Sequence, residues 1–267
     1  MLTLGFDTAT RATAVALWSA DGDGDGDGDG DGDGATGAVT LERRDDPPPG
    51  SRPNHTTRLM ALIVEAMDAA GRGWEDLSLI AVGTGPGTFT GLRIGVASAR
   101  ALAIARSLPL VGVSTLAALA SGAGSRSAHG DGDGSGDDGI VPGGEGILAV
   151  LDARRGEVFA AGWDSPRDVL GAPVLAARAV APEGLAAAVA RTGRRWLAVG
   201  DGAVEFRVVL ERSGVRIPED DSLLHRVSAI EHCRLAQGLR PESPAEVRPQ
   251  YLRLPDAELA LRAARPS

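Results

Sequence analysis

A glycine-rich segment at residues 83–93, Gly-Thr-Gly-Pro-Gly-Thr-Phe-Thr-Gly-Leu-Arg, limits the folds open to this chain more than any other feature. It separates an apolar run that ends at Val82 from a nearly charge-free stretch that predicts a long helix over residues 92–108. Glycine and proline here allow unusual backbone dihedrals and close approach to another group. A helix that begins at this point directs unpaired N–H groups and its positive dipole end at the same space. The segment can therefore hold an anion such as phosphate, or it can be a tight turn only.

The segment departs from the two common phosphate-binding fingerprints. A P-loop ends in Gly-Lys-Ser/Thr, whereas this segment ends in Gly91-Leu92-Arg93. A dinucleotide loop has the spacing Gly-x-Gly-x-x-Gly, whereas Gly91 comes one position late after Gly85 and Gly87. Phosphate contact at this segment therefore stays a hypothesis.

A second candidate site follows the first expected strand. Asp7, with Thr8 and Thr10 beside it, combines a carboxylate and two hydroxyls that could orient a metal–phosphate group. The alternative is an Asx-type turn in which Asp7 satisfies its own backbone. Its occurrence in the same chain as the glycine segment favours a paired site.

Hydrophobic periodicity predicts an α/β protein with two domains. Strands are expected over residues 2–6, 12–18, 38–43, 79–84, 110–113, 147–152, 157–163 and 196–199, and helices over residues 55–70, 92–108, 115–120, 182–191, 203–212 and 223–237. This order divides the chain into domains at residues 1–113 and 114–267. Asn54 is expected to cap the first helix and Gly71 to end it.

Two acidic low-complexity tracts interrupt this pattern. Residues 21–34 are seven Asp-Gly repeats, and a second tract covers about residues 122–146; both are expected to be disordered loops. The repeats lack the glutamate that closes a calcium-binding loop, so specific calcium binding is not expected. Residues 21–34 and 131–139 hold eleven aspartates, so the net charge of −9 becomes about +2 without them. The folded part is near neutral and has no basic stripe of the kind that binds nucleic acid.

The composition also narrows the cellular setting. Cys233 is the one cysteine, which excludes an intramolecular disulfide and is typical of a cytosolic protein. We expect no signal peptide, and no run reaches the roughly 18 apolar residues of a membrane span. The expected localisation is the cytoplasm.

The two long helices are apolar over more of their circumference than a surface helix needs. Either the fold covers them on two sides, or they form a protein–protein interface, which we favour. The residues expected at this interface are Leu59, Leu62, Ile63, Met67, Ile94, Ala97 and Ala101.

The histidines and the cysteine do not have the sequence spacing of a catalytic or metal-binding site. His55 is followed one helical turn later by Leu59, so no His-x-x-x-His metal pair forms there. His225 and His232 could share a helix face, but solvent-facing or capping roles are favoured. Cys233 is expected to be a core thiol, and no Gly-x-Ser-x-Gly elbow occurs. We therefore expect no catalytic residues and no metal.

Four segments together resemble a known family. Residues 4–10 (Leu-Gly-Phe-Asp-Thr-Ala-Thr), 85–95, 152–158 (Asp-Ala-Arg-Arg-Gly-Glu-Val) and 249–253 (Pro-Gln-Tyr-Leu-Arg) are similar, in order, to segments of the TsaB proteins, also called YeaZ. The resemblance covers almost the whole chain except the Asp-Gly tracts, and the central segment is its most specific part.

The resemblance implies a fold and a function. TsaB proteins belong to the superfamily of actin, sugar kinases and Hsp70 (ASKHA) and have two related actin-like α/β domains. They are non-catalytic partners of TsaD, which makes N6-threonylcarbamoyladenosine at position 37 of tRNA, and TsaE joins the two. The expected partners are thus TsaD and TsaE, with tRNA bound only through the complex and a homodimer through the same helices left open. Asp7, Thr8, Thr10, Gly85 and Gly87 would mark a vestigial phosphate site without a cofactor, although a nucleotide at the partner interface stays open.

Two enzyme alternatives remain. One is a nucleotide-dependent enzyme of the same superfamily, either a kinase or a TsaD-like transferase. The other is a metallopeptidase, which the replacement of the second histidine by Leu59 disfavours.

Overall fold

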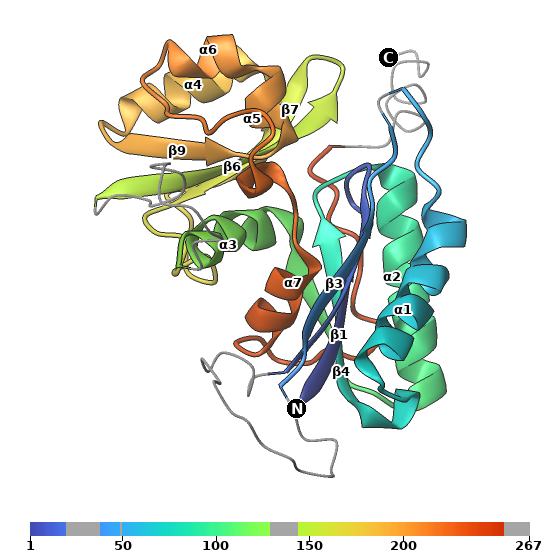
Figure 1. Cartoon of the computed structure of the whole chain (residues 1–267). Coiled ribbons are helices and arrows are strands. Elements are labelled where there is room, and N and C mark those ends of the chain that lie inside the picture. The colour runs from blue at the N-terminus through green and yellow to red at the C-terminus, as the bar shows by residue number, and fades with distance from the viewer. Residues whose placement is uncertain (20–37, 49, 129–143, 254–267) are drawn as a thin grey trace, which may run out of the picture. The chain divides into compact units, whose positions relative to one another are not determined.

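The computed structural model describes residues 1–19, 38–48, 50–128 and 144–253 (Figure 1). The chain forms two compact units. Unit 1 contains Met1–Thr84, Arg93–Val113 and Ser228–Arg248, and unit 2 contains Gly85–Leu92, Ser114–Val227 and the chain from Pro249 onward. The acidic repeats at residues 21–34 and most of the second tract lie outside the described residues.

Unit 1 is a five-stranded mixed sheet with helices on both faces (Figure 1). The strands, in the order β3-β2-β1-β4-β5, are β3 (Thr40–Asp45), β2 (Thr13–Ser19), β1 (Leu2–Asp7), β4 (Leu77–Gly85) and β5 (Leu110–Ser114). Strand β2 runs antiparallel to β1 and β3, and β4 runs parallel to β1. The helices are α1 (His55–Ala70), α2 (Phe89–Arg106) and α7 (Ala229–Ala236).

Successive side chains of β2 point to opposite faces of this sheet, and different helices cover the two faces. Val15 and Leu17 belong to the main core with side chains of α1 and α2, such as Leu59. Ala14 and Ala16 point the other way and pack with Ala229 and Cys233 of α7. Because both faces are covered, every residue of β2 is buried. Cys233 is fully buried, which confirms the expected core thiol, and burial raises its pKa.

Unit 2 repeats this arrangement. Its sheet has the order β8-β7-β6-β9, formed by β8 (Leu175–Val180), β7 (Glu157–Trp163), β6 (Glu145–Arg154) and β9 (Arg195–Val199). The first two pairings are antiparallel and the third is parallel, as in β3-β2-β1-β4. The helices are α3 (Thr115–Ala128), α4 (Pro182–Arg191), α5 (Asp201–Glu205) and α6 (Arg207–Glu211). The shared strand order confirms the expected mixed α/β fold of two related units.

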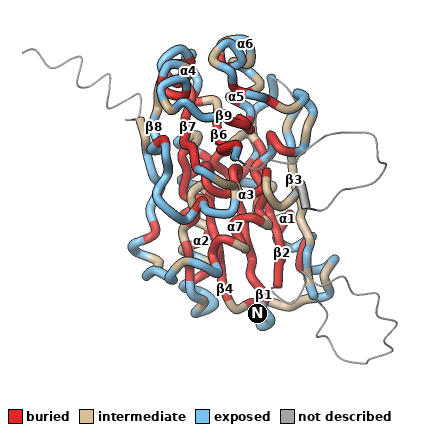
Figure 2. Tube along the Cα trace, turned by 90° about the vertical axis from the view of Figure 1, so that its left-hand side faces the viewer, coloured by how far each residue is buried: buried red, intermediate tan, exposed pale blue. Residues whose placement is uncertain are grey.

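Many expected elements match the structure in place and type. Helices 55–70 and 182–191 and strand 157–163 have the expected bounds. Gly71 ends α1 in the left-handed conformation, with φ 59°, whereas Asn54 makes no side-chain capping hydrogen bond. Buried residues concentrate in the strands of each sheet (Figure 2). Among the described helices, none is long and apolar enough to span a membrane.

Three expected elements are corrected, and one strand is added. The helix expected over residues 203–212 is divided at Phe206 into α5 and α6. The helix expected over residues 223–237 is a 3₁₀ turn, Leu223–His225, followed by extended residues and then α7. Helix α3 continues to Ala128, beyond the expected end. Strand β8 was not expected, because three of its six residues are alanine, which has weak strand propensity.

The domain boundary also differs from the expected division at residue 113. The chain does pass into unit 2 at Ser114, but Ser228–Arg248 lies in unit 1. Helix α7 packs against β1 and β2, where Gly5 makes room for it. A Cβ at Gly5 would lie 2.4 Å from Cys233 Sγ and 2.7 Å from the Ala229 carbonyl oxygen. The close approach of this late helix therefore depends on a glycine in the first strand.

We predict that Gly5→Ala destabilises the protein by about 1–3 kcal/mol, because the added methyl group overpacks the β1–α7 contact. Urea unfolding followed by tryptophan fluorescence measures the change. Gly184→Ala is the matched control, since its Cβ would meet only the end of the Val180 side chain. Equal stability of the two variants would refute the close-packing argument.

Candidate functional site

The turn after β1 begins at a buried carboxylate. Asp7 is the last residue of β1 and is 1% exposed. Its Oδ1 accepts a hydrogen bond of 2.7 Å from the backbone N–H of Ala9. The side chain thus satisfies its own backbone two residues on, as an Asx-type turn does. One oxygen of the candidate site is already used by the turn.

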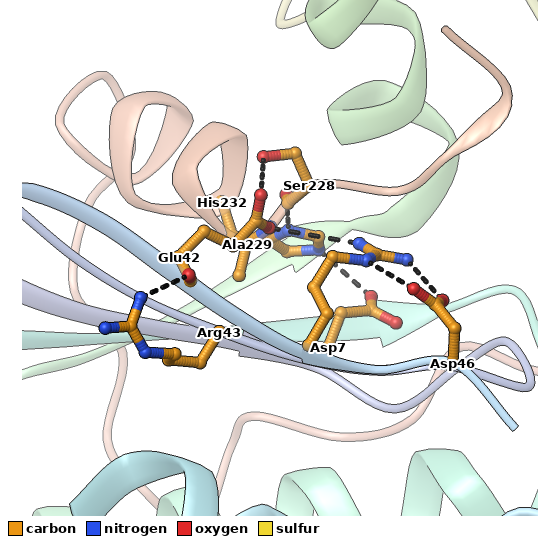
Figure 3. A network of polar contacts seen from close by, with 8 residues as sticks. Asp7, Glu42, Arg43, Asp46, Ser228, Ala229 and His232 are labelled. Carbon is orange, nitrogen blue, oxygen red and sulfur yellow. Dashed lines mark hydrogen bonds and ion pairs between the residues drawn. The ribbon is translucent and has the colours of Figure 1, made fainter. Parts of the chain in front are cut away.

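The second oxygen of Asp7 faces His232 of α7 (Figure 3). Asp7 Oδ2 lies 3.0 Å from His232 Nε2, and His232 is fully buried. The other ring nitrogen, Nδ1, is 2.9 Å from the carbonyl oxygen of Ser228 and must donate to it. Because a carboxylate only accepts, this arrangement favours a proton on Nε2 as well, and therefore the charged form of the ring. Burial by itself lowers the pKa of His232, but the hydrogen bond and charge of Asp7 outweigh burial and raise that pKa.

A second carboxylate fixes the start of α7. Glu42 of β3 accepts hydrogen bonds from the Ala229 N–H at 2.5 Å and from the Ser228 hydroxyl at 3.3 Å. A carboxylate at a helix N-terminus satisfies an unpaired N–H group and opposes the positive dipole end. Arg44 lies 3.9 Å from Glu42 and 3.0 Å from Asp46. Two acidic side chains, from β1 and β3, therefore hold α7 against the sheet.

Two glycines leave the space that this cluster occupies. A Cβ at Gly83 would lie 1.9 Å from Asp7 Oδ2 and 3.0 Å from His232 Nε2. A Cβ at Gly95 would lie 2.4 Å from the Thr8 hydroxyl oxygen. Both glycines are thus required by close packing around the Asp7 turn. This gives a structural reason for glycine at the end of β4 and in the first turns of α2.

The expected phosphate-site residues fall into both units. Asp7, Thr8 and Thr10 lie in unit 1, with Thr8 buried, whereas Gly85 and Gly87 lie in unit 2. Gly85 has φ 110°, and its Cβ would come within 3.0 Å of the Gln250 carbonyl oxygen. No group of three or more His, Cys, Asp or Glu side chains arranged for a metal occurs within the described residues. Each oxygen of Asp7 therefore already has a partner within unit 1, the Ala9 N–H for one and the His232 ring for the other.

Burial divides the residues expected at the interface. Leu59, Leu62, Ile63 and Met67 are at most 4% exposed and pack in the core of unit 1, so their side chains do not lie at its surface. Of the α2 residues, Ile94 is partly buried, and Ala97 and Ala101 are exposed. The large apolar side chains that α1 and α2 do expose are Met60, Val64 and Ile104, at 41%, 46% and 68%.

The histidines are more buried than expected. His55 Nδ1 lies 2.9 Å from the Thr13 hydroxyl oxygen, and burial lowers its pKa despite the nearby carboxylates of Asp7 and Asp45. His225 Nδ1 accepts the Gly200 N–H at 3.1 Å, and burial lowers the pKa of this ring too. The expected solvent-facing alternative is therefore wrong for His232, which sits inside the protein.

Sequence reasoning missed the Asp7–His232 pair, although one signal was present. His232 falls at the apolar positions of α7, since Ala229, His232, Cys233 and Ala236 have the spacing i, i+3, i+4 and i+7. This pattern places the imidazole on the buried face. It does not identify the partner, which lies 225 residues earlier in the chain.

Comparisons with known proteins agree with this architecture. Residues 47–172 match the family model of TsaD, the tRNA N6-adenosine threonylcarbamoyltransferase. YeaZ from Pseudomonas aeruginosa is a similar solved structure, with a TM-score of 0.63 and 26% identity over 94% of this chain and 99% of that one. A crystal structure described as an uncharacterized protein with similarity to peptidase YEAZ from Pseudomonas aeruginosa has a TM-score of 0.66 at the same identity and coverage.

These matches support a YeaZ (TsaB)-type protein related to TsaD. No curated protein matches its sequence. The YeaZ structures are similar along almost their full length, whereas the TsaD match begins just before α1 and ends after β7. Residues 47–172 therefore include the glycine segment but neither Asp7 nor His232.

The Asp7–His232 pair should make the stability of this chain depend on pH. We predict that His232→Gln lowers the free energy of unfolding by roughly 3–5 kcal/mol at pH 6, because it leaves a buried carboxylate without its cation. Since the folded-state pKa of His232 is raised, its contribution is complete below the unfolded pKa of about 6.5 and is lost as pH rises through the folded pKa. Urea unfolding from pH 6 to pH 10 should show the difference from wild type shrinking.

His225→Gln is the control, because its effect on the free energy of unfolding should change with pH in the opposite direction. Because the pKa of His225 is lowered in the folded protein, its contribution is present above pH 6.5 and is lost as pH falls through the folded pKa. Wild-type and His232→Gln stabilities that stay parallel across the whole pH range would contradict the charged pair.

Proposed function

We propose that this chain is a non-catalytic subunit that supports a TsaD-type transferase in forming N6-threonylcarbamoyladenosine at position 37 of tRNA in the cytoplasm. The observation that carries the proposal is the engagement of both Asp7 oxygens, one by the Ala9 N–H and one by the His232 imidazolium. At this strand end a nucleotide-using relative would need the carboxylate for its metal and phosphate. An internal cation there supports a role in assembly rather than in chemistry.

The proposed partner surface is the exposed side of α1 and α2. It consists of Met60 and Val64 on α1 and of Ala97, Ala101 and Ile104 on α2, which we call the α1–α2 surface. Small side chains such as those of Ala97 and Ala101 allow a partner helix to approach closely. We propose that this surface binds TsaD, with TsaE joining the pair. A homodimer of this chain through the same surface is the competing occupant.

A second candidate function is transfer catalysis by this chain itself. The matching family model favours it, because TsaD is the transferase. In that case Asp7 would be required for chemistry, and His232 would have to move away from it. The two functions differ in what the loss of the Asp7 charge does to product formation.

We predict that Met60→Asp and Ala101→Asp each weaken binding to purified TsaD at least about tenfold, because each places a charge in an apolar contact. Isothermal titration calorimetry at fixed salt measures the dissociation constants. Val208→Asp is the matched control, since Val208 is 63% exposed on α6 of unit 2. Full TsaD affinity in both helix variants, with folding verified by circular dichroism, would eliminate the α1–α2 surface.

We predict that the double variant Asp7→Asn/His232→Gln retains its support of TsaD within about threefold of wild type, or less than about 1 kcal/mol. The amide pair keeps a hydrogen bond but removes both charges, so a structural role survives the change. The measurement is modified adenosine formed per tRNA in a reconstituted reaction at saturating chain concentration. A folded, TsaD-binding double variant that lost activity about a hundredfold or more would establish the transferase alternative.

A further inference from the structure

The start of α2 is built from residues that form helices weakly. Its opening sequence, Phe-Thr-Gly-Leu-Arg-Ile-Gly, contains two glycines and no acidic side chain. Glycine is the weakest helix former apart from proline, and a carboxylate near the N-terminus would have opposed the positive end of the helix dipole. Packing explains why the second glycine is kept, because a Cβ at Gly95 would lie 2.4 Å from the Thr8 hydroxyl oxygen. The first turns of α2 therefore depend on contacts from outside the helix.

Residues 249–253, which we call the strap, supply such contacts. The ring of Tyr251 packs on the ring of Phe89, the first residue of α2, with centroids 5.3 Å apart and an interplanar angle of 34°. This separation lies within the range of roughly 4.5–7 Å that favourable aromatic pairs adopt. A Cβ at Gly85 would lie 3.0 Å from the Gln250 carbonyl oxygen, so the strap also packs on the residues that precede α2. Two neighbouring residues of the strap thus contact the chain at the point where α2 begins.

The far end of the strap is attached to the sheet of unit 2. Arg253 Nη1 donates a hydrogen bond of 2.9 Å to Oε2 of Glu157, the first residue of β7. Both side chains are partly exposed, at 25% and 38%, so solvent weakens this ion pair. The ring contact between Tyr251 and Phe89 is therefore the stronger restraint on α2.

Helix α2 continues from the strap contact to the side chains proposed to bind a partner. Its residues 89–92 belong to unit 2 and the remainder belongs to unit 1. Ala97, the first α2 residue of the α1–α2 surface, follows Phe89 by about two helical turns. Helices open from their ends, at a lower free energy than the whole protein unfolds. Opening of the first two turns would leave Ala97 at a frayed end, where a partner helix cannot pack on it.

We propose that the strap holds the first two turns of α2 through the Tyr251–Phe89 ring pair and so prepares the α1–α2 surface for its partner. Tyr251 is a positioning residue: it acts on this surface through α2 and does not touch the partner. The inference deepens the proposed function and rests on it for the identity of the partner, TsaD. It adds residues that are distant from α2 in the sequence to those on which TsaD affinity depends.

Hydrogen exchange in the free, full-length chain tests the helix contact without a partner. We expect Tyr251→Ala to speed amide exchange at residues 92–97 about 2- to 10-fold, which corresponds to the loss of one aromatic pair. Residues 98–106 should exchange as in wild type, because the strap does not contact that part of α2. Equal exchange at residues 92–97 in wild type and Tyr251→Ala would overturn the inference.

Two variants are the controls for this measurement. Tyr251→Phe keeps the ring that packs on Phe89, and it should leave exchange at residues 92–97 unchanged. Leu170→Ala removes another apolar side chain of unit 2, one that is 47% exposed, and should also leave it unchanged. Exchange that is as fast in either control as in Tyr251→Ala would contradict a specific ring contact.

Calorimetric titration with purified TsaD tests whether the contact reaches the partner surface. Tyr251→Ala should weaken binding about 2- to 10-fold, because the apparent affinity falls with the fraction of molecules in which the start of α2 is formed. Thr90 is exposed in the first turn, and Thr90→Glu adds a carboxylate at the positive end of the helix dipole. In the Tyr251→Ala background, it should restore both slow exchange and TsaD affinity.

The combined readouts separate positioning from direct contact. Affinity that stays low after Thr90→Glu has restored slow exchange would mean that TsaD touches the Tyr251 ring itself, and this would overturn the inference. Unchanged affinity in Tyr251→Ala despite faster exchange would overturn it as well, because the start of α2 would then be irrelevant to the partner.

The proposed function and this inference fail separately. A wild-type chain that does not bind TsaD would refute the proposed function, and the exchange of residues 92–97 would still report whether the strap holds α2. A chain that binds TsaD equally well with and without the Tyr251 ring would refute the inference alone.

Discussion

The ion pair between Asp7 and His232 is the contact on which the organisation of unit 1 depends. It joins the end of the first strand to a helix that returns only after the chain has built most of unit 2. Three other residues make this contact possible. Gly83 leaves room for the Asp7 carboxylate, and Gly5 lets α7 approach β1 closely. Glu42 binds the first N–H group of α7 and so fixes the start of that helix. A buried ion pair stabilises only when its remaining hydrogen-bonding groups are satisfied. Here the Ala9 N–H and the Ser228 carbonyl oxygen satisfy them.

The same device recurs in unit 2, which supports a common plan for the two units. Asp152 lies two residues before the end of β6, whereas Asp7 is the last residue of β1, and the Asp152 Oδ1 accepts the N–H of Arg154 two residues on, also at 2.7 Å. Its second oxygen lies 2.8 Å from the Arg154 guanidinium. In each unit, therefore, the carboxylate at the first hairpin has one oxygen in an Asx-type turn and the other on a cation of the chain itself. The duplicated sheet order and the duplicated turn agree with each other, since they place equivalent residues at equivalent strand ends.

What could be predicted from the sequence is what depends on near neighbours. The bounds of α1 and α4 follow from periodicity and from end signals such as Gly71 and the proline at the start of α4. The sequence predicts the Asx-type turn at Asp7 as one of two alternatives, because this turn needs only residues two positions apart. The partner of Asp7 could not be predicted, since no local pattern links residue 7 to residue 232. For the same reason, local periodicity predicts one helix over residues 223–237. In the structure, extended residues separate the turn at Leu223–His225, which belongs to unit 2, from α7, which belongs to unit 1.

The expected interface shows a second limit of periodicity. An apolar stripe wider than one helix face indicates that two sides of the helix are covered. It does not indicate whether the rest of the fold or a partner protein covers them. The apolar side chains of α1 fall into two groups. Those of Met60 and Val64 are exposed, whereas the core of unit 1 contains those of Leu59, Leu62, Ile63 and Met67. A partner protein can contact only the side chains that are not buried in the core of unit 1. The residues that define α1 as a helix of this fold are therefore different from those that can bind a second protein, and substitutions in the first group report on folding alone.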